Sequence, residues 1–351
     1  MQRRVLTVMM VLALFLFAVS AWAGTEGAKN TFYGQGAGTS TTGDDDYGTF
    51  IGAGAGSANT TGSSNTFLGY RAGYSNTTGN SNTFLGVSAG NSNTTGSQNA
   101  FLGYMAGTSN TTGFRNTFLG DVVGSHNTTG NSNTFLGYYA GIANTTGNSN
   151  TFLGLSAGQT NTTGNFNTFL GTAAGYKTNG YGNVFLGYQA GYNETGSYKL
   201  YIDNSNTATP LIYGEFNNDI LAINGKVGIG KKPSTHPLEM ASGAHVTTGG
   251  VWTNASSREY KEDIETLSRE EALDTLEGLN PVKFAYKADM TERHVGFIAE
   301  DVPELVALKD RKGLSPMDIV AVLTKVVQEQ EKAIQGLTDK VKELERELRR
   351  Q

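Results

Sequence analysis

Side chains that could carry out acid–base or metal chemistry are scarce over most of this 351-residue chain. From residue 57 to residue 193, the charged and imidazole side chains are Arg71, Arg115, Asp121, His126 and Lys177. A glycosidase needs two facing carboxylates, and a calcium-binding repeat needs an acidic ligand in every copy. The sequence therefore predicts neither activity for this segment. His126 occupies a variable position of the repeat described below, so we interpret it as a surface residue rather than a metal ligand.

The chain contains no cysteine. This excludes disulfides, a lipoprotein anchor, thiolate catalysis and thiolate metal sites. We interpret the acidic run Asp44–Asp46 as a solvated loop, and we expect neither a metal nor a cofactor. The formal charge of −5 is small for this length, so bulk electrostatics predict no nucleic-acid partner.

The first residues have the pattern of an export signal. A short basic stretch precedes an almost unbroken apolar run from Val5 to Val19, and Ala21 and Ala23 are the small residues that a signal peptidase recognises. The apolar run is shorter than the roughly 20 residues that cross a bilayer. We therefore predict a cleaved Sec-type signal peptide over residues 1–23, no membrane span in the mature chain, and an extracellular or cell-surface location.

A seventeen-residue repeat fills the first half of the chain, with the unit Asn-Thr-Phe-Leu-Gly-x-x-Ala-Gly-x-x-Asn-Thr-Thr-Gly-x-x. One phenylalanine marks each regular copy: Phe50, Phe67, Phe84, Phe101, Phe118, Phe135, Phe152 and Phe169. Phe185 closes the array one residue early, and Phe32 marks an imperfect first copy. A short period of this kind is typical of a solenoid, in which each copy buries its apolar face against its neighbours.

The residue types predict a β-solenoid rather than a helical one, because Asn, Thr and Gly disfavour helices. Thr-Phe-Leu predicts a short strand whose Phe and Leu point to opposite faces. Ala-Gly predicts one corner, and Asn-Thr-Thr-Gly predicts a second, in which Asn bonds nearby backbone and Gly adopts a positive φ. We expect one apolar row to fill the coil and the other to face another subunit. Asn-Thr-Thr also matches a glycosylation acceptor, but its periodicity favours the turn interpretation.

The pattern changes after residue 196. Short alternating segments predict strands near 199–203, 210–214, 220–225 and 226–230, whereas 233–250 is loose and rich in small residues. Charge rises sharply from Arg258 onward. The expected organisation is a mainly β chain with a signal peptide (1–23), a lead-in (24–47), a parallel β-solenoid or β-roll shaft (48–196), a β-rich connector (197–250), a small α+β domain (251–316) and a coiled coil (317–351).

Three ordered blocks in the α+β segment carry a family resemblance. Ala255–Ile264 reads ASSREYKEDI, Leu279–Tyr286 reads LNPVKFAY, and His294–Pro303 reads HVGFIAEDVP. Together they resemble the intramolecular chaperone domain found behind endosialidases and other phage tail spikes, the peptidase S74 family. The resemblance covers about the last hundred residues. The repeat region is similar in architecture to the heads of trimeric adhesins.

The resemblance implies a homotrimer and a Ser-Lys dyad that cuts the chain immediately before the serine. Carried over, Ser256 is the nucleophile, Lys261 is the general base, and the broken bond joins Ala255 to Ser256. A lysine can serve as a base only if burial or neighbouring charges lower its pKa toward neutrality. His294 and Glu300 are candidate accessory residues, with packing the expected role of His294.

Two residues depart from the family pattern. The family often has Asp after the serine and Arg two residues further on, where this chain has Ser257 and Glu259. Ser257 is therefore a rival nucleophile. A second interpretation makes Ser256 a helix cap, because Ser-x-x-Glu with Glu259 matches a capping box.

The C-terminal segment has the heptad pattern of a coiled coil, with charged flanks. Its expected seam consists of Val320, Leu323, Val327, Gln330, Ile334, Leu337, Val341, Leu344 and Leu348. β-Branched residues at a with Leu at d favour a dimer in isolation, whereas the family resemblance implies a trimer. Gln330, at a d position, is expected to fix register.

These observations predict a secreted trimeric fibre or adhesin-like protein whose C-terminal domain drives trimerisation and then releases itself by cleavage at Ala255–Ser256. The rival hypothesis is a non-cleaving surface adhesin with a permanently attached trimerisation domain. A polysaccharide-degrading spike is disfavoured because the repeats lack paired carboxylates. The chain itself is the expected partner, and a cell-surface or glycan target is a candidate second partner.

Overall fold

The structure, a computed structural model, describes residues 29–42 and 47–350. The expected signal peptide and Asp44–Asp46 therefore lie outside the described residues. The chain divides into two compact units, Met1–Asn254 and Ala255–Gln351, and each is presented by itself.

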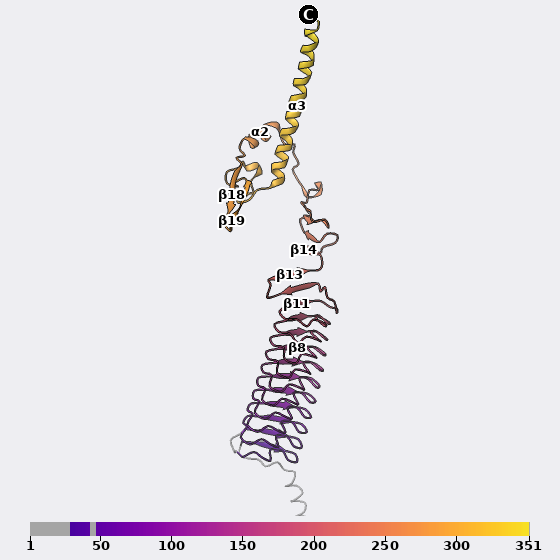
Figure 1. The fold of residues 1–351 in the computed structure, drawn as a ribbon, viewed down its shortest axis with the longest axis vertical. Coiled ribbons are helices and arrows are strands. Elements are labelled where there is room, and N and C mark those ends of the chain that lie inside the picture. The colour runs from indigo at the N-terminus through magenta and orange to yellow at the C-terminus, as the bar shows by residue number, and fades with distance from the viewer. Residues whose placement is uncertain (1–28, 43–46, 351) are drawn as a thin grey trace, which may run out of the picture. The chain divides into compact units, whose positions relative to one another are not determined.

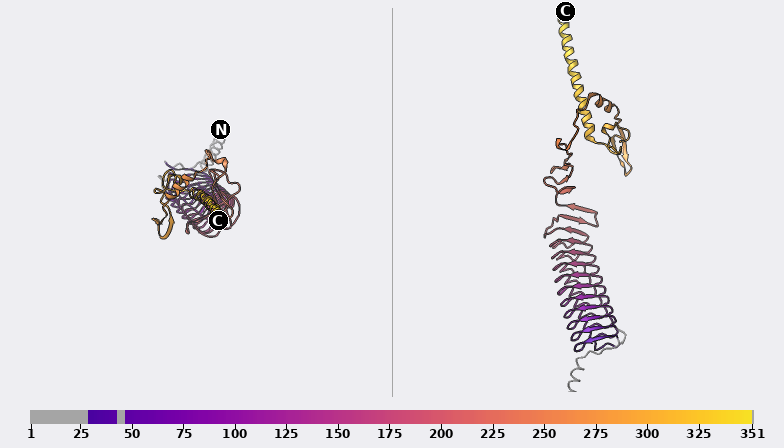
Figure 2. Two further views of the ribbon diagram at one scale, coloured as in Figure 1. Left: turned by 90° about the horizontal axis from the view of Figure 1, so that it is seen from above. Right: turned by 180° about the vertical axis from the view of Figure 1, so that it is seen from behind.

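The first unit is a parallel β-solenoid, as predicted. Strands β1 to β10 contain three residues each and pair in parallel, every strand with the next one along the chain, so that they lie one above another in Figure 1 and, from behind, in Figure 2. They are β1 (Thr31–Tyr33), β2 (Thr49–Ile51), β3 (Thr66–Leu68), β4 (Thr83–Leu85), β5 (Ala100–Leu102), β6 (Thr117–Leu119), β7 (Thr134–Leu136), β8 (Thr151–Leu153), β9 (Thr168–Leu170) and β10 (Val184–Leu186).

A column of phenylalanines forms the core of the solenoid. From Phe32 to Phe185, consecutive rings stack with centroids 4.7 to 5.0 Å apart, and the rings from Phe50 onward are fully buried. The next residue points outward, and Leu119 keeps 44% of its surface exposed. The predicted split between an inner and an outer apolar row is thus confirmed.

Asparagine side chains hold the second corner of the regular coils. Asn76 donates from Nδ2 to the Gly79 carbonyl at 3.1 Å and to Asn59 Oδ1, one coil earlier, at 2.8 Å. The pattern repeats along the stack from Asn76 to Asn161. Every asparagine of this ladder is fully buried, which is tolerated because its amide is hydrogen-bonded. Burial of these asparagines also supports the turn interpretation over glycosylation.

Glycines at two positions of the repeat, one directly after the strand and one in the Asn-Thr-Thr-Gly corner, are needed for different reasons. Gly103 has a φ of +139°, and a Cβ there would lie 2.0 Å from the Gly120 carbonyl oxygen of the next coil. Gly79, in the Asn-Thr-Thr-Gly corner, was predicted to have a positive φ, and this is wrong because its φ lies outside the left-handed region. A Cβ at Gly79 would instead come within 2.4 Å of Asn76 Oδ1 and of the Gly96 carbonyl oxygen. Close approach of neighbouring coils, not backbone conformation, requires glycine here.

Strands β11 (Lys199–Ile202), β12 (Ile212–Glu215) and β13 (Ile220–Ile223) end the solenoid sheet. The first continues the parallel stack on β10, and the other two turn back in antiparallel order. A separate sheet follows, formed by β14 (Val227–Ile229), β15 (Leu238–Met240), β16 (His245–Val246) and β17 (Trp252–Thr253). Residues 233–250, expected to be loose, thus contribute two strands, because a buried glutamate described below anchors the loop before β15.

The second unit is a small α+β domain. It contains the turn η1 (Arg258–Tyr260), helix α2 (Arg269–Glu277), the hairpin β18 (Val282–Tyr286) and β19 (Asp289–Gly296), the turn η2 (Glu304–Val306) and helix α3 (Pro316–Leu348). A capping box between Ser268 and Glu271 starts α2. The buried core consists of Ala272, Val302, Val306, Val322 and Val326. Within residues 29–42 and 47–350, no helix has the length and apolar character needed to cross a bilayer.

Candidate functional site

The turn η1 brings the two predicted dyad residues to the same place. Ser257 precedes the turn in an extended conformation, with φ −64° and ψ 146°, and its Oγ accepts the Glu259 backbone N–H at 3.2 Å. Backbone hydrogen bonds from Tyr260 N–H to Ser257 O (3.1 Å) and from Lys261 N–H to Arg258 O (3.2 Å) close the turn. Ser256 and Lys261 therefore flank a single tight turn.

The predicted nucleophile and the predicted base are in direct contact. Lys261 Nζ lies 3.0 Å from Ser256 Oγ, with the ammonium donating the hydrogen bond. This distance is within the range for proton transfer between a nucleophile and its base. Both residues are exposed in the single chain. A general base must be neutral to accept the serine proton, a role that burial or neighbouring positive charge favours for a lysine side chain.

The helix-cap interpretation of Ser256 is corrected by this geometry. The cap of η1 is Ser257, one residue later, because Ser257 Oγ and not Ser256 Oγ accepts the Glu259 N–H. No lysine or histidine donates a hydrogen bond to Ser257 in the part of the chain that the structure describes. The rival nucleophile therefore has no base in contact with its hydroxyl.

The two candidate accessory residues lie elsewhere in the domain. His294, on β19, faces Phe284 across the hairpin and packs its ring edge-to-face near Tyr286, with centroids 5.1 Å apart. The exposed Glu300 uses its backbone carbonyl to accept a hydrogen bond from Arg311. Among the described residues, no hydrogen bond or ion pair joins either residue to the Ser256–Lys261 pair. Packing with aromatic side chains is thus the observed setting of His294.

The segment that contains this pair can be compared with known families. Residues 256–308 match the Peptidase_S74 family, the chaperone of endosialidase. The match to this chaperone family begins at Ser256 and contains Lys261, α2, the hairpin and η2, in agreement with the sequence resemblance. It covers neither the solenoid nor α3. Neither the curated proteins nor the solved structures contain a match to the chain.

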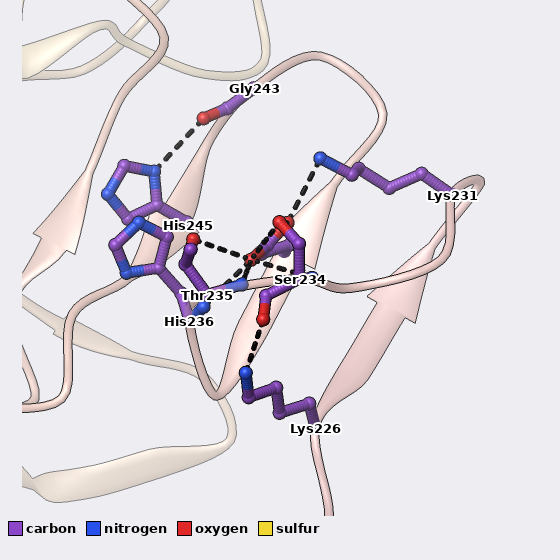
Figure 3. Close-up of polar contacts among 8 residues, drawn as sticks. Lys226, Lys231, Ser234, Thr235, His236, Gly243 and His245 are labelled. Atoms are coloured by element: carbon purple, nitrogen blue, oxygen red, sulfur yellow. Dashed lines mark hydrogen bonds and ion pairs between the residues drawn. The ribbon is translucent and has the colours of Figure 1, made fainter.

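A buried carboxylate outside the chaperone-family segment was not identified from the sequence. Glu239, on β15, accepts backbone N–H groups from Thr235 and His236 at 2.7 Å each and from Ser234 at 3.1 Å, and Lys231 forms an ion pair with it at 2.9 Å (Figure 3). The His236 backbone hydrogen bond, followed by the Lys231 contact, holds the pKa of Glu239 well below its usual value. The only sequence signal was a single Glu between Leu238 and Met240.

This cluster is an anchor for the loop rather than a binding site. Every donor to Glu239 comes from residues 231–236, so the carboxylate fixes the loop between β14 and β15. The rings of His236 and His245 stack beside it, with centroids 3.7 Å apart (Figure 3). Among the described residues, no group of three or more His, Cys, Asp or Glu side chains is arranged to hold a metal ion.

Helix α3 has two apolar faces, one buried in the core of its own domain and one exposed in the described part of the chain. Val322 and Val326 are buried in the domain core, where α3 packs on α2. The predicted seam lies on the other face, and its apolar members are exposed by 42% to 78%: Val320, Leu323, Val327, Ile334, Leu337, Val341, Leu344 and Leu348. Gln330 is also exposed. An exposed apolar stripe of this length is typical of a helix that associates with other helices.

Proposed function

We propose that this chain is a secreted trimeric fibre or adhesin-like protein whose C-terminal domain drives trimerisation and folding and then releases itself. The proposed cut is at Ala255–Ser256. The observation that carries the proposal is the 3.0 Å contact between Lys261 Nζ and Ser256 Oγ, at the first residue of the chaperone-family match and two residues after the first compact unit ends. The solenoid serves as a stalk or adhesin, with a cell-surface or glycan target as its candidate partner.

The proposed chemistry is an acyl transfer followed by hydrolysis. Lys261, once neutral, takes the proton of the Ser256 hydroxyl as Oγ attacks the carbonyl carbon of Ala255. The C–Oγ bond forms, the Ala255–Ser256 C–N bond breaks, and Lys261 returns the proton to the departing Ser256 amine. Water then hydrolyses the ester, which frees the Ala255 carboxylate and restores the serine hydroxyl. The domain acts once, because its only substrate bond is then broken.

Assembly is proposed to supply the burial that the dyad lacks in the single chain. Burial disfavours the charged form of a lysine and lowers its pKa. The exposed seam of α3 provides a means of bringing chains together. Cleavage would then follow correct association, because only the assembled chains would supply that burial.

The exposure of both dyad residues also supports the alternative, a non-cleaving adhesin whose trimerisation domain stays attached. In that case the Ser256–Lys261 contact is a surface hydrogen bond. The two functions differ in one covalent bond, so a single experiment separates them.

The test is to express residues 24–351 and to determine the masses and N-terminal sequences of the products. Ser256→Ala and Lys261→Ala are compared with Lys287→Ala, an exposed lysine in the same domain. We expect a fragment that begins at Ser256 from the unmodified chain and from Lys287→Ala, and intact chain from both dyad variants. Intact chain in every case, with trimers present, would refute self-cleavage and would support the non-cleaving adhesin with an attached trimerisation domain.

A further inference from the structure

We infer that Ser257 is a positioning residue for the proposed cleavage: its hydroxyl caps the turn that holds Lys261 against Ser256, and it is not the nucleophile. The inference rests on the proposed function. It also resolves the choice between two adjacent serines that the sequence leaves open.

The turn η1 depends on few interactions. None of its three residues is buried, so packing does not fix its conformation. Its hydrogen bonds are the Ser257 Oγ contact to the Glu259 N–H at 3.2 Å and the two backbone bonds made by Tyr260 and Lys261. The side-chain cap is therefore a large share of what holds the turn.

Loss of the turn would separate the dyad. Ser256 and Lys261 are five residues apart, and five residues of extended chain span on the order of 17 Å. The chain must fold back at η1 for Lys261 Nζ to lie 3.0 Å from Ser256 Oγ. A free N–H group at the start of a helical turn is best satisfied by the side-chain oxygen of Ser, Thr, Asp or Asn. Ser257 supplies that oxygen at the residue where the turn begins.

The first experiment follows the cleavage rate of residues 24–351 in two variants of Ser257. Ser257→Ala removes the cap, and we expect cleavage to slow about fivefold, the factor that corresponds to a typical cap. Ser257→Asn restores a capping oxygen but not a hydroxyl, so we expect a rate close to that of the unmodified chain. In all three proteins the released fragment should begin at Ser256, and the assembly state should be the same by analytical ultracentrifugation.

Two results would overturn the inference. Complete loss of cleavage in both variants would identify Ser257 as the nucleophile. Cleavage of Ser257→Ala at the unmodified rate would show that the cap does not position the dyad.

A second measurement tests the cap without cleavage. In a Ser256→Ala background, hydrogen exchange over residues 255–262 should be about fivefold faster with Ser257→Ala than with Ser257→Asn. Equal exchange would refute the capping role. If the unmodified chain is never cleaved, the proposed function fails, and this measurement still decides whether Ser257 holds the turn.

Discussion

Replacing Phe118 by alanine should open the solenoid locally, whereas replacing its neighbour Leu119 should not. Phe118 is fully buried, and its ring stacks between Phe101 and Phe135 with centroid distances of 4.8 and 4.9 Å. Truncation removes both stacking contacts and leaves a cavity, a change that typically costs 3–5 kcal/mol. Leu119 keeps 44% of its surface exposed. Its truncation should therefore cost about 1 kcal/mol, roughly half the value for a fully buried leucine.

The assay is hydrogen exchange combined with denaturant unfolding of residues 24–351. Each coil of a solenoid contacts only its neighbours, so the loss should be local. With Phe118→Ala, amide protection should fall in β5, β6 and β7 and remain unchanged in β2 and β3. Leu119→Ala provides the matched control, since it alters the adjacent residue of the same strand.

Equal losses of protection in the two variants would refute the assignment of an inner and an outer row. A larger loss of protection for Leu119→Ala than for Phe118→Ala would show that the outer row is the more deeply buried one. That outcome would be expected if the outer rows of several chains pack together more tightly than the phenylalanine column of each.

Two further predictions concern assembly and pH. Leu337→Asp places a charge in the proposed seam. We expect this variant to form no trimers, as measured by analytical ultracentrifugation, and to show no cleavage. Gly336→Asp adds the same charge at a neighbouring position with open space around it, and it should preserve trimers and cleavage. Loss of trimers in both variants would contradict the assignment of the seam. Glu239 has a lowered pKa in the folded state. Its contribution to the stability of the loop is therefore complete above the pKa of an unfolded glutamate, about 4.3, and is lost as pH falls below that value. Relative to the intrinsic exchange rate at each pH, amide protection over residues 227–240 should fall in this acidic range. With Glu239→Gln, protection should be low and should not change with pH there. A pH-dependent protection that survives Glu239→Gln would assign the response to another group.

The repeat made the solenoid predictable because a single pattern recurs often enough to exclude other folds. The alternation of Phe and Leu was sufficient to predict both the strand and its two faces. The role of Gly79 was not predictable, because its need for glycine arises from the Gly96 carbonyl of the next coil. Contacts of that kind depend on how closely coils stack, which no local propensity encodes. The strands within residues 233–250 were missed for a related reason, since Glu239 anchors its loop through backbone N–H groups that are present in every sequence.

The candidate site was predictable only in part. The family blocks identified Ser256 and Lys261, and the structure brings their side chains into contact. The cap on Ser257 was assigned one residue too early, because Ser256 and Ser257 both satisfy a capping pattern and only backbone geometry separates them. His294 lies among Phe284 and Tyr286, a setting created by the register of the hairpin rather than by sequence spacing.

The regularity of the solenoid makes its register difficult to establish during folding. Because neighbouring coils are nearly identical, looping out one repeat would bring Phe84 onto Phe118 with almost the same contacts, and such near-equal alternatives slow folding. The coils at both ends of the array are irregular, since the first, from Phe32 to Phe50, is one residue longer than the regular ones. The coil that ends at Phe185 is one residue shorter. Thr178 there stands where the ladder would continue, so Asn161 Oδ1 has no partner among the described residues. Strands β11 to β13 then add a unique antiparallel end. Register is therefore defined at the ends of the array, and the end that precedes the chaperone-family segment in the sequence also has these antiparallel strands. We propose that coils add from this end once the domain has brought the chains together.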